Sequence, residues 1–452
     1  MIWISIAVMI GTIVASLSML RSCRGDALGI PLVAIGAFAF LYVIQPIQLI
    51  LSGSSELFLT DRQFAYALLV PAFMLACFMW GWLYPFRMRL SAVALWDSRA
   101  MWNAGFWAAS IGLILYLMFL ERSGGITHSF SQAHGRAMDY NDNTAYLYDG
   151  HWLMLSGSAM MMLGEARIKL ERWKRVAPYV FLSINLLSAI LTGSRGPLFA
   201  VATTYFVGRS IAQRKRVSFP QAARMLLPVG VVVLLMVGYR NVLHLNPQTS
   251  SQVASPETAY DEVAGVSEYD MEHDTASQEF LFHAALLDTV DETGKLDYGL
   301  SWVWWVVLNP IPKLIWREKQ YPQSTGASWG DIEEQTGIAI SPGAAPGIVA
   351  DLYGRFHLFS AIFLLALGAG LRRLFRSARN LNSPVTAVGY VMFYAVSLNM
   401  FAQGFSTIFV PLGFSMAPVV LFAWASQRKA KLRRTEMILR QVAAPHGGQW
   451  SS

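Results

Sequence analysis

The sequence predicts an all-α polytopic membrane protein with about 11 transmembrane helices. Of its 452 residues, 54% are hydrophobic and only 14% are charged, which is more apolar than an ordinary soluble domain. Stretches of about 20 mainly apolar residues, the length that a helix needs to cross a bilayer, recur along the chain. The basic residues also alternate between loops, as they do in membrane proteins with a fixed orientation.

The predicted spans follow one another with two long interruptions. The first has no basic residue ahead of it and no small-residue cleavage pattern, so we expect it to be retained rather than removed as a signal peptide. The fifth and sixth are shorter than the others. The spans cover residues 1–20, 27–52, 63–85, 104–120, 151–164, 177–193, 197–213, 222–243, 346–370, 384–402 and 405–426.

The charges of the connecting segments set the expected orientation. Cytoplasmic loops of membrane proteins are enriched in Lys and Arg. Alternation of the predicted loops places 25 of the 35 basic residues and 5 of the 28 acidic residues on one side. We therefore expect the N-terminus outside and the C-terminus in the cytoplasm. The net charge of +7 then reflects topology, and no nucleic-acid partner is expected.

The chain divides at two long loops on the predicted outer side, which carries most of the acidic residues. Loops of such length are usually functional or disordered. The parts are residues 1–243 with eight spans and the loop 121–150, the large loop 244–345, residues 346–426 with three spans, and a cytoplasmic tail, 427–452.

The large loop contains two elements that are predicted to be helical or membrane-associated. In "ASQEFLFHAALLDTVDE", residues 280, 281, 284, 286 and 287 are apolar and can share one face of an amphipathic helix. The apolar run in "YGLSWVWWVVLNPIPKLIWREKQYP" has about 11 residues, which is too short to span a bilayer. Its tryptophans suit the headgroup level, so we expect a re-entrant or interfacial element.

The tight turn "LTGSRGPL" places Arg195 between two apolar spans at the outer membrane face. Its glycines allow unusual backbone angles, and Pro197 suits the first turn of the next helix. A helix N-terminus beside a guanidinium favours an anion, above all a phosphate. Ser194 and Gly196 belong to the same turn and to the predicted anion site. The alternative is a snorkelling arginine that only anchors a hairpin.

Other arginines gather near the same face, at Arg240, Arg317 and Arg355. Charges at membrane depth are costly and are usually functional. Arg317 could also be an interfacial anchor, and Arg355 could pair with Asp351 one helical turn away. A group of arginines at the outer leaflet fits the diphosphate of an isoprenoid-linked sugar, because a departing diphosphate needs stabilisation of its charge.

The acceptor hydroxyl in such a transfer needs a base. Asp351 is the first choice, at a membrane-level helix start, followed by His283 and Glu279 on the loop helix. For Asp351 the alternative is a helix-end acid or salt-bridge partner, and for the other two a solvated helix face. The sequence shows no metal-ligand spacing, Walker loop, dinucleotide fingerprint or nucleophile elbow, so neither a metal nor a cofactor is expected.

Three stretches resemble the O-antigen polymerase family, the Wzy-type polymerases of oligosaccharide repeat units. They are "LTGSRGPL", "IPKLIWREKQYP" and "SPGAAPGIVADLYGRF", and they lie between about residues 190 and 356. The resemblance implies a GT-C-type fold at the bacterial inner membrane. It also implies transfer of a glycan from undecaprenyl diphosphate to the next lipid-linked repeat unit at the periplasmic face. Arg195, and less directly Arg240 and Arg317, carry over as the key arginines.

The sequence departs from this family at two places. Members often have a glutamate where this chain has Asp351, and an Asn-Phe-Gly run near Gly354–His357. The alternatives are an O-antigen ligase or protein-glycosylating transferase, a transporter or flippase for lipid-linked glycans, or a structural assembly partner. The ligases commonly carry a histidine eight residues before Glu-Leu, and this chain lacks it. The expected partners are the bilayer, the lipid-linked oligosaccharide, and optionally a chain-length regulator and a flippase.

Overall fold

The computed structural model forms helices throughout the part of the chain that it describes. Within that part, every regular element is an α-, 3-10 or π-helix. The described residues are 1–22, 29–53, 58–84, 97–123, 125, 146–166, 168, 170–191, 195–218, 221–222, 224, 278–308, 316, 326–327, 329–338, 344–381 and 383–443.

The helices form two runs along the chain, separated by the helices between residues 278 and 336. In the first half they are α1 (Ile2–Ser22), α2 (Ile30–Ala39), the π-helix η1 (Phe40–Ile44), α3 (Gln45–Leu51), α5 (Asp61–Leu83), α6 (Ser98–Arg122), α9 (Gly150–Glu165), α10 (Arg172–Leu191) and α11 (Arg195–Ala212). In the second half they are α16 (Gln278–Thr293), α17 (Leu300–Leu308), α18 (Trp329–Thr336), α19 (Gly347–Phe356), η2 (His357–Phe359), α20 (Ser360–Arg379), α21 (Pro384–Gln403), η3 (Phe405–Ile408) and α22 (Phe409–Ala443).

Seven helical segments of the described chain are long and apolar enough to cross a membrane, by length and composition. The chain is therefore a multi-pass helical membrane protein. The segments are Ile2–Arg21, Ile30–Leu51, Asp61–Leu83, Ser98–Arg122, Gly347–Arg379, Pro384–Gln403 and Phe405–Lys429.

Four of the predicted spans are not among these seven. The segments 151–164, 177–193 and 197–213 form α9, α10 and α11. However, α9 has only 16 residues, α10 begins with three basic residues in its first four, and α11 carries Arg195 and Arg209. The segment 222–243 lies outside the described residues except at 222 and 224.

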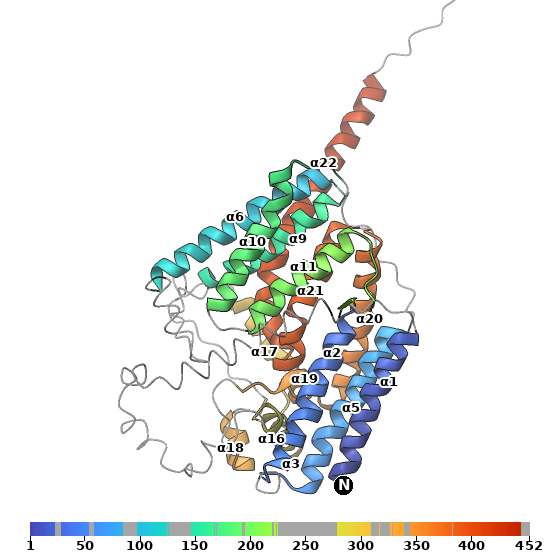
Figure 1. Ribbon diagram of the computed structural model, residues 1–452, viewed down its shortest axis with the longest axis vertical. Coiled ribbons are helices and arrows are strands. Elements are labelled where there is room, and N and C mark those ends of the chain that lie inside the picture. Colours follow the sequence, from blue (N-terminus) through green and yellow to red (C-terminus); the bar gives the residue numbers. More distant parts are fainter. Residues whose placement is uncertain are drawn as a thin grey trace, which may run out of the picture.

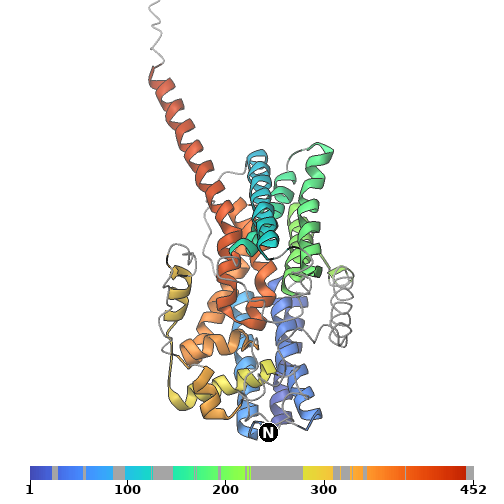
Figure 2. The same ribbon diagram turned by 90° about the vertical axis from the view of Figure 1, so that its left-hand side faces the viewer.

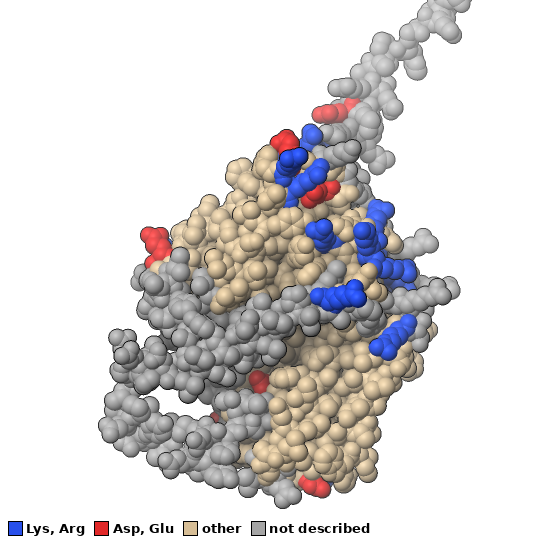
Figure 3. Space-filling model, in the orientation of Figure 1, with Lys and Arg blue, Asp and Glu red and all other residues tan. Residues whose placement is uncertain are grey.

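The helices form two groups joined by α21, and α22 packs against the second group (Figure 1). One group contains α1, α2, α5 and α20, and the other contains α6, α9, α10 and α11. The end of α22 projects beyond the bundle at the end opposite the N-terminus (Figure 2). Lys and Arg side chains gather over the upper part of one face, and none is visible over its lower part (Figure 3). Asp and Glu side chains are visible over both parts of the same face (Figure 3).

Helix α9 has 16 residues and lies inside the bundle. It packs against α6, α10, α11, α21 and α22, and nearly all of its residues are buried. Glycines recur every seven residues, at Gly150, Gly157 and Gly164 on α9 and at Gly105 and Gly112 on α6. A Cβ atom added at Gly157 would lie 2.4 Å from the Gly105 carbonyl oxygen. The small residues therefore bring the two helix backbones into direct contact, as is common in membrane proteins.

Candidate functional site

The long helical segment Gly347–Arg379 is interrupted close to the turn that joins two other spans. Between α19 and α20 the chain turns at His357, whose φ of 51° lies in the left-handed region that non-glycine residues rarely adopt. Between α21 and α22 it turns at Gly404, with a φ of 128°. Such breaks leave backbone groups without helical partners, and at membrane depth these groups need partners from the protein.

Asp351, on α19, connects the interrupted segment to the turn between α21 and α22. Its Oδ2 accepts hydrogen bonds from the backbone N–H of Phe405 at 2.7 Å and of Ser406 at 3.2 Å. Gly404 packs against the same carboxylate, since an added Cβ would lie 3.1 Å from Oδ2. The carboxylate thus caps the helical turn η3, where a negative group stabilises the free N–H groups.

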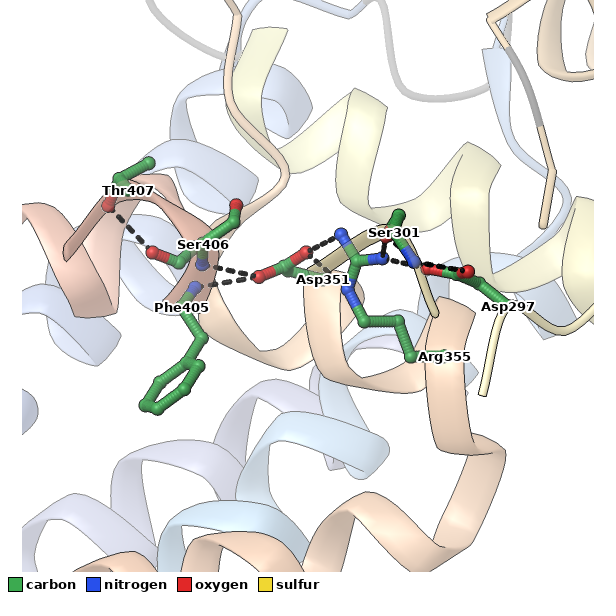
Figure 4. A network of polar contacts seen from close by, with 8 residues as sticks. Asp297, Ser301, Asp351, Arg355, Phe405, Ser406 and Thr407 are labelled. Carbon is green, nitrogen blue, oxygen red and sulfur yellow. Dashed lines mark hydrogen bonds and ion pairs between the residues drawn. The ribbon is translucent and has the colours of Figure 1, made fainter. Parts of the chain in front are cut away.

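The other oxygen of Asp351 binds Arg355 (Figure 4). Nη2 and Nε of the guanidinium donate to Oδ1 at 2.7 and 3.1 Å, and Nη1 donates to Asp297 and Ser301. The guanidinium also lies 4.9 Å from the centre of the Trp302 ring. The Arg355, Asp297 and Asp351 side chains are only 17%, 3% and 8% exposed. One cation is therefore shared by two buried carboxylates.

This network limits what its members offer to a substrate. The guanidinium of Arg355 already faces two carboxylates, so a diphosphate would have to compete with both of them. Both oxygens of Asp351 already accept hydrogen bonds. The geometry favours the salt-bridge interpretation of Asp351 and Arg355 over direct contact with substrate. It also fixes the start of α17 to α19, because Asp297 accepts from the Ser301 backbone N–H at 3.0 Å.

The other two predicted bases lie on α16, which is buried rather than half-solvated. Glu279 accepts a hydrogen bond from Gln45 Nε2 at 2.8 Å. His283 is 1% exposed, with Nε2 3.1 Å from the Ala67 carbonyl oxygen and Nδ1 3.4 Å from Tyr42 Oη. Burial lowers the pKa of His283 to about 3. His283 is therefore a neutral packing residue, and the expectation of a solvated face is wrong at this position.

A second polar cluster, which the sequence did not reveal, lies beside the first. Tyr353 Oη is 2.6 Å from Asp291 Oδ1, 2.6 Å from Tyr66 Oη and 2.7 Å from His357 Nε2. His357 Nε2 is also 3.0 Å from Asp291 Oδ1. The tyrosine is buried, whereas the His357 and Asp291 side chains are 39% and 35% exposed. The cluster is thus anchored in the core and open on one side.

The hydrogen bonds of this cluster select one form of the imidazole. Tyr353 donates its proton to Asp291, so its oxygen accepts from Tyr66 and from His357. His357 then carries its proton on Nε2, and Nδ1 is the nitrogen with a free lone pair. A carboxylate that orients an imidazole in this way is the arrangement of a general base. His357 can take up a proton while Asp291 stabilises the imidazolium.

The predicted arginine turn begins helix α11. Arg195 is its first residue, and Gly196 faces Asn399 of α21, whose Oδ1 would lie 3.0 Å from an added Cβ. Asn399 lies five residues before Gly404, about 7.5 Å along a helix. The turn therefore approaches the same end of α21 as Asp351. Ser194, Arg240 and Arg317 lie outside the described residues.

The part of the chain that the structure describes contains no set of metal ligands. No group of three His, Cys, Asp or Glu side chains is placed to hold an ion there. The fold and site together define a multi-pass helical membrane protein with a polar centre at one end of its bundle. No family model, curated protein or solved structure matches the chain.

Proposed function

We propose that the protein is a glycosyltransferase that polymerises undecaprenyl-diphosphate-linked repeat units into a surface polysaccharide. The transfer takes place at the periplasmic face of the bacterial inner membrane. In this proposal the chain crosses the membrane about 11 times, with α9, α10, α11 and residues 222–243 as the additional spans, in a GT-C-type arrangement. The N-terminus is periplasmic and the C-terminus cytoplasmic, as the distribution of basic loops favours.

One observation supports this proposal above the others. Two of the three stretches that resemble the polymerases, the arginine turn and the Gly-rich entry to the ninth predicted span, converge on the last turns of α21. Gly196 faces Asn399 there, and Asp351 contacts Gly404. The third stretch lies outside the described residues except for Trp316. The two stretches, about 150 residues apart in sequence, therefore meet at one end of the same helix, as the parts of a common site would.

The chemistry assigned to this site needs an anion holder and a proton acceptor. Arg195, at the N-terminus of α11, is the proposed holder of the diphosphate, whose negative charge increases as it leaves. The bond between the anomeric carbon and the diphosphate oxygen breaks, and a bond forms to the acceptor hydroxyl oxygen. The hydroxyl proton passes to His357 Nδ1. Asp291 and Tyr353 keep the imidazole in the required tautomer.

The direct test is transfer by the purified full-length protein, supplied with lipid-linked repeat units extracted from the native cells. Wild type should convert them into a ladder of polymers, and Arg195→Ala should abolish the ladder. Arg62→Ala is the matched control, because Arg62 is an exposed arginine on the same predicted side. A ligase would transfer only to another acceptor, and a flippase would give no transfer. Either result, or a normal ladder from Arg195→Ala, would contradict the proposal.

The proton acceptor has a separate test. His357→Asn removes the base and keeps a polar side chain at this position. Transfer should fall about 10²- to 10⁴-fold, the usual contribution of general-base catalysis. Asp291→Asn should leave a measurable rate but alter its pH profile, because the imidazolium loses its partner. Unchanged rates and profiles in both variants would assign His357 a structural role only.

A further inference from the structure

A second polar region lies at the opposite, basic end of the bundle, where α9 and α11 end and α10 begins. Two adjacent cavities of about 590 and 540 Å³ open there. Both are lined by Arg209, Gln213 and Lys215, and the first also by Arg214. The only acid in the linings of these two cavities is Glu165, and it lies 3.8 Å from Arg175, which lines neither cavity.

The loop that carries these cations has a defined conformation. Arg379 Nη1 donates to the carbonyl oxygens of Lys215 at 2.6 Å and of Ser210 at 3.3 Å. Ser210 Oγ donates to the same Lys215 carbonyl at 2.8 Å. Arg214 holds a φ of 54°, which turns the chain sharply after α11. The loop is therefore fixed before any ligand arrives, which lowers the entropy lost on binding.

Among the described residues, the cations of this loop form no close ion pair with an acidic side chain, although Arg209 acts electrostatically on Glu165. In the described chain, Arg209, Arg214 and Lys215 form no ion pair with a carboxylate within 4.0 Å. Arg209 instead lies 5.9 Å from the ring centre of Tyr205 and donates to its hydroxyl at 3.3 Å. A pocket with several cations and one neutralised acid attracts an anion.

The cavities are also continuous with apolar surface. Met162, Tyr179 and Ala212 line the first cavity together with the cations. On α10, next to Tyr179, Val176 and Val180 are 55% and 49% exposed. A ligand that fills such a site carries a negative headgroup and an apolar chain.

We propose that these cavities bind the phosphate headgroup of an anionic phospholipid, with an acyl chain lying along α10. Basic pockets at the cytoplasmic ends of membrane helices are suited to such lipids. The site is separate from the proposed transferase centre, so it does not depend on that proposal.

The test is native mass spectrometry of the detergent-purified full-length protein with equal amounts of phosphatidylglycerol and phosphatidylcholine. Wild type should retain phosphatidylglycerol selectively. The double variant Arg209→Gln, Lys215→Gln should bind it roughly 25-fold more weakly, since each basic residue near an anionic surface contributes about five-fold. The matched control, Arg428→Gln with Lys429→Gln on α22, removes equal charge outside the cavities and should behave as wild type.

Three results would overturn the assignment. They are equal retention of both lipids by wild type, equal losses in the cavity and control variants, and displacement of bound lipid by millimolar inorganic phosphate. The last result would mean that the site takes a free anion. Arg209→Lys with Lys215 retained provides the folding check. It preserves the charge and should keep most of the selectivity if headgroup charge is what is recognised.

Discussion

The buried network around Arg355 gives the most discriminating prediction about the candidate site. Arg355→Met removes the only cation of the described residues that contacts Asp297 and Asp351, whose side chains are 3% and 8% exposed. Removal of one partner from a buried ionic network costs about 3–5 kcal/mol, because the remaining charges stay uncompensated. We expect a folded protein with a lower free energy of unfolding, because two buried carboxylates lose their cation.

The size of the thermal shift follows from the length of the chain. Unfolding entropy is about 2.1 cal/mol/K per residue, or roughly 0.9 kcal/mol/K for the 452 residues. A loss of about 3–5 kcal/mol therefore lowers the midpoint by about 3–5 °C. The assay is tryptophan fluorescence of the detergent-purified protein during heating. Arg62→Met, at an exposed arginine, should change the stability by less than about 0.5 kcal/mol.

A rescue experiment separates the effect of the two carboxylate charges from the effect of side-chain shape. Asp297→Asn and Asp351→Asn, added to Arg355→Met, remove both negative charges while an amide oxygen can still accept the bonds from Ser301, Phe405 and Ser406. The triple variant should recover more than half of the lost stability. The reasoning is refuted if Arg355→Met melts like wild type and yet transfers no glycan. In that case the guanidinium would serve the substrate, as the gathering of arginines at the outer face first suggested.

The remaining predictions concern packing, pH and topology. Gly157→Val should force α6 and α9 apart and lower the stability by several kcal/mol, because its Cβ would lie 2.4 Å from the Gly105 carbonyl oxygen. Gly413→Ala should be neutral in the same melting assay, because no atom lies within 4 Å of the added Cβ. Below pH 6.5 the unfolded chain binds a proton on His283 that the folded chain, with a His283 pKa of about 3, does not bind. This difference should cost wild type up to about 1.4 kcal/mol of stability per pH unit. His283→Gln should reduce this pH dependence, and equal slopes in the two proteins would contradict the prediction. A reporter fused after the C-terminus should be cytoplasmic, and a periplasmic signal would invert the proposed topology.

Hydropathy was sufficient to predict most of the membrane-spanning architecture. Seven predicted spans match segments found by length and composition, and the Trp-rich run is a helix of 9 residues, too short to cross. The hydropathy pattern was less informative about the role of α9, because a helix that is enclosed by other helices can be shorter than the thickness of the bilayer. The seven-residue spacing of Gly150, Gly157 and Gly164 was the available sign that this helix packs closely against another.

The site was predictable only where its partners are close in sequence. The pair Asp351–Arg355 follows from their separation of four residues. Asp297 is 58 residues from Arg355, and Asp291 is 66 residues from His357. No local pattern joins residues at such distances, because the meeting depends on how α16 and α17 fold back against α19. Individual carboxylates in an acidic loop therefore could not be ranked from the sequence.

Both polar clusters connect the segment 278–308, which belongs to the predicted large loop, to the interrupted segment α19–α20. Asp291 comes from the loop helix α16, whereas His357 comes from the interrupted segment α19–α20. A base assembled from a loop and a membrane helix works only if the two keep a fixed separation, because proton transfer needs hydrogen-bond geometry. The bridge from Asp297 through Arg355 to Asp351 joins the same two parts of the chain. In the proposed reaction, the neutralised Arg355 would therefore act by holding His357 and Asp291 in place and not by binding the substrate.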